Sequence, residues 1–205
     1  MFAEFLSLHC RDLRLEVVAV CNTGTDGLVA VRHQQPDLLL LDFSLPDANG
    51  LEIARVLLAE FPRLRILGIS SHRDPYTMLQ VQRLGLHGFI DKQDQRPEVL
   101  TQAIQLVMSG QIYYSPVVVA ASNTLRRDPR AFTRVLSDYQ IRILSLIGES
   151  KTDEEIAAAL QITTATVQSR RRDIMRKLDV HSTPKLIHFA IVNGLTRPDQ
   201  LNPKS

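Results

Sequence analysis

The fold is decided by residues 36–50, which read PDLLLLDFSLPDANG. Four leucines in succession lead directly into Asp42. A short, continuous apolar run of this kind is typical of a strand that is buried on both faces, as in a parallel sheet. The strand predicted at 37–42 therefore ends on a carboxylate, and the apolar run places that carboxylate at the edge of the sheet.

Strands and helices alternate along the first half of the chain. Short apolar segments typical of strands lie at 15–20, 37–42, 64–70 and 87–90. Segments with the apolar spacing of helices lie at 2–9, 25–34, 50–61, 74–83 and 96–108. This rhythm with short loops predicts a parallel sheet that is covered by helices on both faces.

Chemically active side chains fall at the ends of three predicted strands. Asp42 ends one strand, Ser70 ends the next, and Lys92 follows the one after that. The carboxyl ends of parallel strands meet at one edge, where ligands bind. A carboxylate there can attack phosphorus, while a hydroxyl and an ammonium bind the phosphoryl oxygens. Each residue alone is better explained as a cap, a strand-end hydroxyl or a solvated charge, but three of them at successive strand ends favour phosphoryl chemistry.

The segments PDLLLLDFSLPDANGLE, ILGISS and GFIDK resemble the receiver domain of bacterial response regulators, over about residues 2–115. The resemblance implies a flavodoxin-like, doubly wound parallel sheet and a sensor histidine kinase as partner. It implies that Asp42 is the phospho-acceptor, that Ser70 and Lys92 contact the phosphoryl group, and that Phe89 is the switch aromatic.

One part of the receiver pattern is missing. The resemblance implies a first strand ending in two acidic residues that hold Mg²⁺, between the strands at 15–20 and 37–42. Glu4 and Asp12 do not form such a pair, so apart from Asp42 the sequence offers no identifiable metal ligand. The start codon is misplaced, or a true variant has closed its sheet, or another chain completes it. The cost of unpaired backbone groups favours the first explanation. We therefore expect Mg²⁺ for the family but not for this chain as it stands, and impaired phosphorylation at Asp42.

The second half of the chain is more basic than the first. Residues 123–205 contain 14 Lys or Arg against 9 Asp or Glu, whereas residues 1–122 contain 10 against 13. We predict a receiver domain at 1–115, a linker without periodicity at 116–135, and an all-α helix-turn-helix domain at 136–205. Its helices begin at recognisable caps, namely the pairs Ser137 with Gln140 and Thr152 with Glu155, then Thr163, then Thr183–Pro184.

The third helix of this domain has two distinct faces. Val167, Ile174 and Leu178 fall on the face predicted to pack on the core, flanked by Met175 and the stem of Arg171. A polar and basic face is what the major groove of DNA accepts. A solvated basic face is the plain alternative, but the position in a capped turn motif favours DNA. The candidate DNA-binding residues are Thr166, Gln168, Ser169, Arg170, Arg172, Arg176 and Lys177.

This half resembles the LuxR-type C-terminal domain of NarL/FixJ-class response regulators, from LSDYQIRIL through TVQSRRRDIMRKL to IHFAIVNGL. The resemblance implies that Gln168, Ser169 and Arg172 face bases and that Lys177 faces the DNA backbone. The family usually has Glu, Lys and His where this chain has Gln140, Gln168 and Arg170, so the DNA sequence that is read can differ. We also expect a homodimer through the apolar stripe of the last helix, formed by Leu186, Ile187, Ala190 and Ile191.

The leading interpretation is a DNA-binding transcriptional response regulator in which the receiver, phosphorylated at Asp42, controls the helix-turn-helix. A degenerate receiver that acts without phosphorylation is the alternative, and a protein-binding adaptor is a weaker one. An Asp42-dependent phosphohydrolase would place a second aspartate two residues on, where Ser44 stands, so we expect no enzyme. Cys10 and Cys21 show no ligand or disulfide pattern, and no segment is long and apolar enough for a membrane. We therefore expect a cytoplasmic protein without membrane contact.

Overall fold

The computed structural model describes residues 2–71, 74–93, 96–128 and 131–196. The chain divides into two compact units, Met1–Arg73 with Gln80–Ala120 and Asp74–Leu79 with Ala121–Ser205. Residues 129–130 of the predicted linker and 197–205 of the predicted second domain lie outside the described residues. No helix among the described residues combines the length and the apolar composition that crossing a membrane requires.

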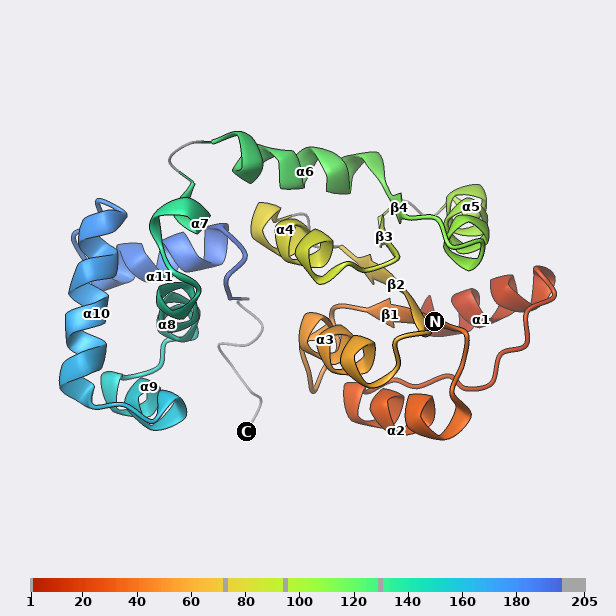
Figure 1. Cartoon of the computed structure of the whole chain (residues 1–205), viewed down its shortest axis with the longest axis horizontal. Helices are drawn as coiled ribbons and strands as arrows, with labels where there is room; N and C mark the ends of the chain where they lie inside the picture. Colours follow the sequence, from red (N-terminus) through yellow and green to blue (C-terminus); the bar gives the residue numbers. More distant parts are fainter. Residues whose placement is uncertain (1, 72–73, 94–95, 129–130, 197–205) are drawn as a thin grey trace. The chain divides into compact units, whose positions relative to one another are not determined.

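The first unit is built on a four-stranded sheet, and the sheet is parallel, as predicted (Figure 1). Its strands are all parallel and adjacent in chain order: β1 (Leu38–Asp42), β2 (Arg65–Ser70), β3 (Gly88–Asp91) and β4 (Tyr113–Tyr114). Helices α1 (Phe2–Asp12) and α2 (Gly24–Gln34) precede β1 in the chain, and α3 (Gly50–Glu60), α4 (Pro75–Leu84) and α5 (Pro97–Met108) lie between successive strands. Strand β4, which has only two residues, was not predicted.

Helices cover both faces of this sheet. On one face, Cys10 of α1 and Ile104 of α5 pack with Leu67, Ile69 and Ile90 of the central strands. On the other face, α3 packs against β1 and buries Ile53, Ala54 and Leu57. Figure 1 shows α1 and α5 on one side of the strands and α2 with α3 on the other. The layered α/β fold is therefore confirmed.

The prediction of a strand at 15–20 is wrong. This segment forms no strand among the described residues, and β1 pairs only with β2. Leu15 and Val17 still pack against the core beside α1 and α5, but Val18 and Val20 are 44% and 50% exposed. A strand exists only where a neighbour satisfies its backbone groups. The neighbour that the resemblance implies, between 15–20 and β1, is not among the described residues.

The second unit contains the four helices that were predicted from residue 137 onward. They are α8 (Asp138–Gly148), α9 (Asp153–Leu160), α10 (Thr164–Lys177) and α11 (Thr183–Val192). The predicted capping boxes at Ser137 with Gln140 and Thr152 with Glu155 are both present, and the Thr163 side chain caps α10. Residues from all four helices form one core, which includes Leu144, Ile156, Val167, Ile174 and Leu186.

The region predicted as an aperiodic linker is largely helical. It contains α6 (Pro116–Arg127) and the short α7 (Phe132–Val135). The buried positions of α6 include Ser122 as well as Val118, one turn earlier, whereas Val117 and Val119 are exposed. The polar residue on the buried side and the valines on the exposed side remove the apolar periodicity by which a helix is recognised.

Candidate phosphorylation site and nucleic-acid interface

The ends of β1 and β3 bring together a carboxylate and an ammonium. Lys92 Nζ lies 2.6 Å from Asp42 Oδ2, and both side chains are partly buried. The backbone N–H of Lys92 donates to the carbonyl of Ser70 at 2.8 Å. Asp42 Oδ1 accepts a hydrogen bond from the Ser44 N–H at 2.8 Å. Three predicted residues, Asp42, Ser70 and Lys92, thus lie at one edge of the sheet.

The predicted switch aromatic lies inside the unit. Phe89 is fully buried and packs edge-to-face on Phe43, with ring centroids 5.0 Å apart. Gly68 leaves the space for this ring, because a Cβ at that position would come within 2.5 Å of the Phe89 ring. Ser70 is also fully buried, two residues after Gly68 on β2. The inward orientation of Phe89 therefore depends on Gly68, a residue that the sequence motifs do not mark.

The described residues do not provide a magnesium site. Mg²⁺ prefers oxygen ligands in octahedral geometry, usually carboxylates together with waters and phosphate oxygens. The described part of the chain contains no group of three or more His, Cys, Asp or Glu side chains that could hold a metal ion. Asp47, on the loop after β1, is engaged elsewhere: its oxygens accept hydrogen bonds from the N–H groups of Gly24 and Thr25 at the start of α2. The described residues therefore form no cluster of ligands that fits this ion.

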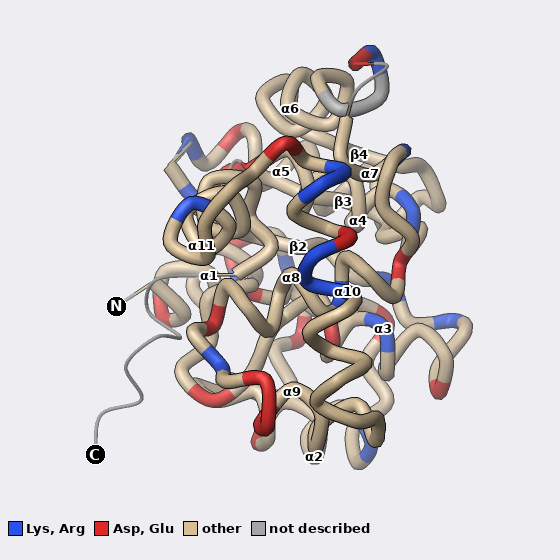
Figure 2. Tube along the Cα trace, turned by 90° about the vertical axis from the view of Figure 1, so that its left-hand side faces the viewer, with Lys and Arg blue, Asp and Glu red and all other residues tan. Residues whose placement is uncertain are grey.

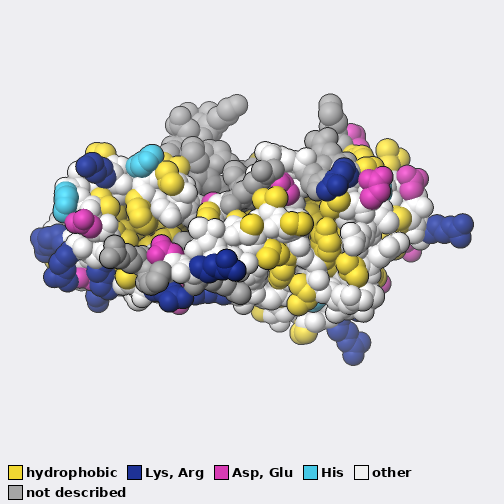
Figure 3. All heavy atoms as spheres, turned by 90° about the horizontal axis from the view of Figure 1, so that it is seen from above, with side chains coloured by type: hydrophobic (Ala, Val, Ile, Leu, Met, Phe, Trp, Pro, Cys, Tyr) yellow, Lys and Arg dark blue, Asp and Glu magenta, His cyan; other side chains and the backbone are white. Residues whose placement is uncertain are grey.

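Helix α10 presents the predicted polar and basic face to solvent. Val167 and Ile174 are buried in the core, as predicted. Gln168, Ser169, Arg170, Arg172 and Arg176 are exposed, while Thr166 is half-buried and shares a hydrogen bond with Thr163. Figure 2 shows the lysine and arginine positions gathered along α10, and Figure 3 shows basic side chains grouped on the surface of the second unit. Such a helix surface can contact phosphates and base edges.

Comparisons with known proteins agree with both halves of this description. Residues 1–105 match the family described as the response regulator receiver domain, and residues 134–190 match the luxR family of bacterial regulatory proteins. The oxygen regulatory protein NreC of Staphylococcus carnosus (strain TM300) is 30% identical over 190 residues, or 88% of this chain and 87% of the relative. NreC of Staphylococcus aureus (strain JH9) is 31% identical with the same coverage. The chain belongs to the response regulators with a LuxR-type DNA-binding domain.

Solved structures of such regulators share its fold. RcsB of Salmonella enterica serovar Typhimurium, bound to the rprA promoter with the phosphomimetic BeF3⁻, has a TM-score of 0.63 at 20% identity. That match covers 95% of this chain and 92% of the other. An RcsB–DNA complex has a TM-score of 0.61 at 19% identity and covers 93% of each chain. These structures share the fold, and the family matches identify the chain as a DNA-binding transcriptional response regulator of the NarL/FixJ class.

Several polar contacts of this response regulator were not predicted from its sequence. Lys177, which is expected to face the DNA backbone, donates a hydrogen bond to Gln140 Oε1 at 2.9 Å. Gln140 Nε2 donates to Asp173 Oδ2 at 2.6 Å, and Asp173 also pairs with Arg176. The sequence itself shows that residue 140 is a glutamine where the family usually has a glutamate. Its contact with Asp173 joins two helices, so helical spacing cannot predict it.

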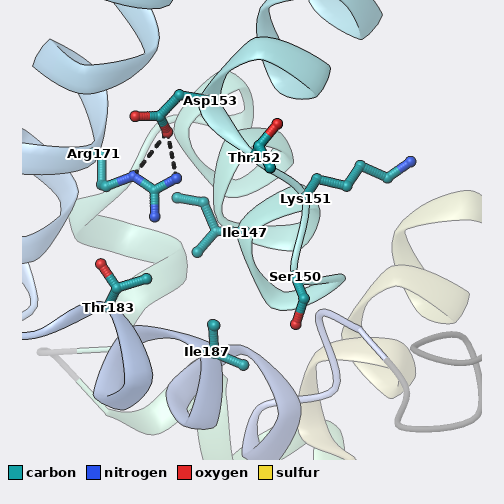
Figure 4. A pocket seen from close by; sticks show the side chains of 8 residues that line it. All are labelled: Ile147, Ser150, Lys151, Thr152, Asp153, Arg171, Thr183 and Ile187. Carbon is teal, nitrogen blue, oxygen red and sulfur yellow. Dashed lines mark hydrogen bonds and ion pairs between the residues drawn. The ribbon is translucent and has the colours of Figure 1, made fainter.

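Arg171 also has a role beyond the apolar packing that was predicted for its stem. Its guanidinium pairs with Asp153, the first residue of α9, at the wall of a cavity of about 400 Å³ (Figure 4). Figure 4 shows Arg171 turned from α10 toward Asp153, with Ile147 and Ile187 nearby. The described lining includes none of the seven predicted DNA-binding residues. Arg171 therefore joins α9 to α10 and is not part of the exposed basic face.

The stripe predicted for dimerisation on α11 needs a correction. Leu186 and Ala190 are fully buried in the core of their own unit and cannot meet a second copy. Ile187 and Ile191 are half-buried, and Val192 is exposed. Leu186 and Ala190 lie four residues apart and so share one helix face, which packs against α8. The apolar surface available outside the unit is the opposite side of α11.

Proposed function

We propose that the exposed face of α10 reads DNA in the major groove. Gln168, Ser169 and Arg172 would contact bases, with Thr166, Arg170, Arg176 and Lys177 at or near the phosphates. The observation that carries this proposal is the exposure of the polar and basic residues on a helix whose opposite face, at Val167 and Ile174, is locked into the core. Arginine pairs with guanine in two hydrogen bonds, and glutamine pairs likewise with adenine.

Removal of one base-facing side chain tests this face. Arg172→Ala should cost about 1–3 kcal/mol at a duplex that the full chain selects from a random pool, and should relax base preference at one position. Arg142→Ala, an exposed arginine of α8, is the matched control and should leave the preferred sequence unchanged. Fluorescence anisotropy with selected and scrambled duplexes measures both. Equal loss of both duplexes for Arg172→Ala would refute the assignment of faces.

For the receiver, we propose that Asp42 is the phospho-acceptor and that a sensor histidine kinase is the donor. An oxygen of the Asp42 carboxylate would form the new bond to phosphorus as the bond to the donor breaks. Lys92 would stay beside the phosphoryl oxygens, and the Ser70 hydroxyl and Phe89 ring would respond to them. The pairing of Lys92 with Asp42 at 2.6 Å and the burial of Phe89 support these roles.

We further propose that the 205-residue chain binds DNA without needing phosphorylation. A phosphoryl group would add negative charge beside Asp42, and among the described residues only Lys92 makes an ion pair with it. The described residues also include no cluster of three or more His, Cys, Asp or Glu side chains that could hold Mg²⁺. DNA titrations of the chain and of Asp42→Asn, with and without acetyl phosphate and Mg²⁺, should give the same affinity. A gain that needs both Mg²⁺ and Asp42 would contradict this expectation.

We propose a homodimer on DNA, formed through the outward side of α11. Ile187, Ile191 and Val192 form the apolar part of that side, and one solved relative is described as two RcsB dimers bound to two parallel DNAs. Ile191→Glu should therefore weaken self-association in sedimentation experiments while leaving the unit folded. We also propose a cytoplasmic regulator that is not an enzyme, because a phosphohydrolase using Asp42 would need an acid where Ser44 stands.

A further inference from the structure

One acidic residue lies among the basic residues of α10. The carboxylate of Asp173 pairs with Arg176 through Oδ1 and accepts a hydrogen bond from Gln140 Nε2 at 2.6 Å through Oδ2. Lys177 Nζ lies 3.8 Å from the same Oδ2. A single carboxylate is therefore within reach of both cations in the last turn of the helix.

The geometry of this cluster is fixed by α8. Gln140 is only 4% exposed, and its Oε1 accepts hydrogen bonds from the Ser137 N–H at 3.0 Å and from Lys177 Nζ at 2.9 Å. Because two donors face Oε1, the amide Nε2 must point the other way, toward Asp173. The capping box of α8 therefore determines where the Asp173 carboxylate and the Lys177 ammonium lie.

This arrangement limits what the two cations can do. Arg176 is 80% exposed, yet its guanidinium is directed by the carboxylate one turn earlier on the helix. Lys177 is held against α8. A cation with such partners is less available to any phosphate that approaches, and the negative charge of Asp173 itself repels the DNA backbone. Sequence-independent affinity comes mainly from free cations at phosphates, whereas discrimination needs side chains in fixed positions.

We propose that Asp173 is a positioning residue for DNA recognition: it restrains Arg176 and Lys177, which lowers affinity for DNA in general and preserves discrimination between sequences. This inference rests on the proposed role of α10. Asp173 acts through its neighbours, since both of its oxygens already have partners within the domain.

Asp173→Asn is the direct test, because it keeps the size of the side chain and removes its charge. The affinity for a scrambled duplex should rise, and the slope of log K against log salt should steepen by about 1 to 2 as one or two cations reach phosphates. The ratio of selected to scrambled affinity should fall by roughly tenfold, the equivalent of one charge-assisted contact. An unchanged slope together with an unchanged ratio would overturn the inference.

Asp179→Asn is the matched control for net charge. Its side chain is 93% exposed just beyond α10 and pairs only with His181 among the described residues. If loss of any negative charge near α10 were sufficient, both variants would change the ratio of selected to scrambled affinity equally, and that result would also overturn the inference. We expect Asp179→Asn to leave the ratio unchanged.

A double variant distinguishes the contributions of Arg176 and Lys177, and it also serves as the test if Asp173→Asn does not fold. Gln140→Glu with Asp173→Asn returns a carboxylate to Lys177 but leaves Arg176 without one, so the salt slope should steepen by about 1 only. If Asp173→Asn alone fails to fold, the double variant tests the inference in its place. A salt slope equal to that of the parent would then refute the restraint of Arg176 by Asp173. Failure of the proposed DNA face is distinguishable, because Arg172→Ala would then change the affinities for the selected and the scrambled duplex equally or not at all.

Discussion

Segment 15–20 and helix α9 are both short, and each has a clear local pattern. The first is a short apolar run typical of a strand, and the second begins at a capping box. Helix α9 forms where predicted, whereas 15–20 forms no strand. The start of α9 satisfies its own backbone: Thr152 accepts the N–H of Glu155, and Glu155 accepts the N–H of Thr152 at 2.7 Å. The backbone groups of 15–20 can be satisfied only by a neighbouring strand. A helix signal is therefore self-contained, and a strand signal is conditional on a partner that lies elsewhere in the chain.

If the helical unit is self-contained, damage to its core should stay within it. Ile174→Ala removes a fully buried side chain from the core shared by α8, α9, α10 and α11. We expect a loss of about 2–5 kcal/mol in the stability of this unit. Amide hydrogen exchange should show lost protection in α8–α11 and unchanged protection in β1–β3. Val135→Ala, at an exposed position of α7, is the control. For Ile174→Ala, an equal loss of protection in the sheet would show that the units do not unfold separately.

A substitution at Gly68 should destabilise the first unit in the same local way. A methyl group at Gly68 would lie 2.5 and 2.8 Å from atoms of the Phe89 ring. Gly68→Ala should therefore destabilise the first unit by about 1–3 kcal/mol, because the ring must shift within a packed core. Gly27→Ala in α2 is the control, since its Cβ meets no atom within 4 Å and alanine favours a helix. Urea denaturation compares the two, and an equal effect of both would contradict the packing argument.

The sequence was sufficient where a residue's role depends on position along one element. Asp42, Ser70 and Lys92 lie together because parallel strands end at a common edge. The exposed face of α10 follows from helical periodicity in the same way. What could not be predicted depends on side chains of different elements. The bond between Gln140 and Asp173 joins α8 to α10, and the bonds from Asp47 join the loop after β1 to α2. Such pairings have no fixed spacing in the chain.

The hydrogen bonds to Asp47 make the stability of the first unit depend on pH. Hydrogen bonds from the Gly24 and Thr25 N–H groups and the Thr25 hydroxyl lower the pKa of Asp47 to about 2 from its usual 3.8. The folded state thus favours the ionised carboxylate. Its contribution is present above about pH 4 and is lost as the pH falls through about 2. Asp47→Asn should be less stable than the parent at pH 6, and the difference should vanish near pH 2.

Urea unfolding at several pH values measures this difference. Asp37→Asn is the control, because Asp37 is an exposed aspartate just before β1 and its hydrogen bond to Arg65 uses the backbone carbonyl. We expect the control to follow the parent at every pH. A difference between Asp47→Asn and the parent that persists unchanged at pH 2 would show that the carboxylate charge is not what holds the start of α2.

The smallest expected effect is the one that bears most directly on segment 15–20. Val18→Thr replaces a methyl group by a hydroxyl at nearly constant volume, on a side chain that is 44% exposed. If the segment lacks a strand partner, the cost should be below about 0.5 kcal/mol, as at other surface positions. The matched control is Val107→Thr in α5, which is fully buried and should cost about 1–3 kcal/mol because the hydroxyl loses water. Urea denaturation of both variants gives the comparison. Equal costs would mean that residue 18 is as buried in solution as residue 107, and the segment would then have found the neighbour that makes it a strand.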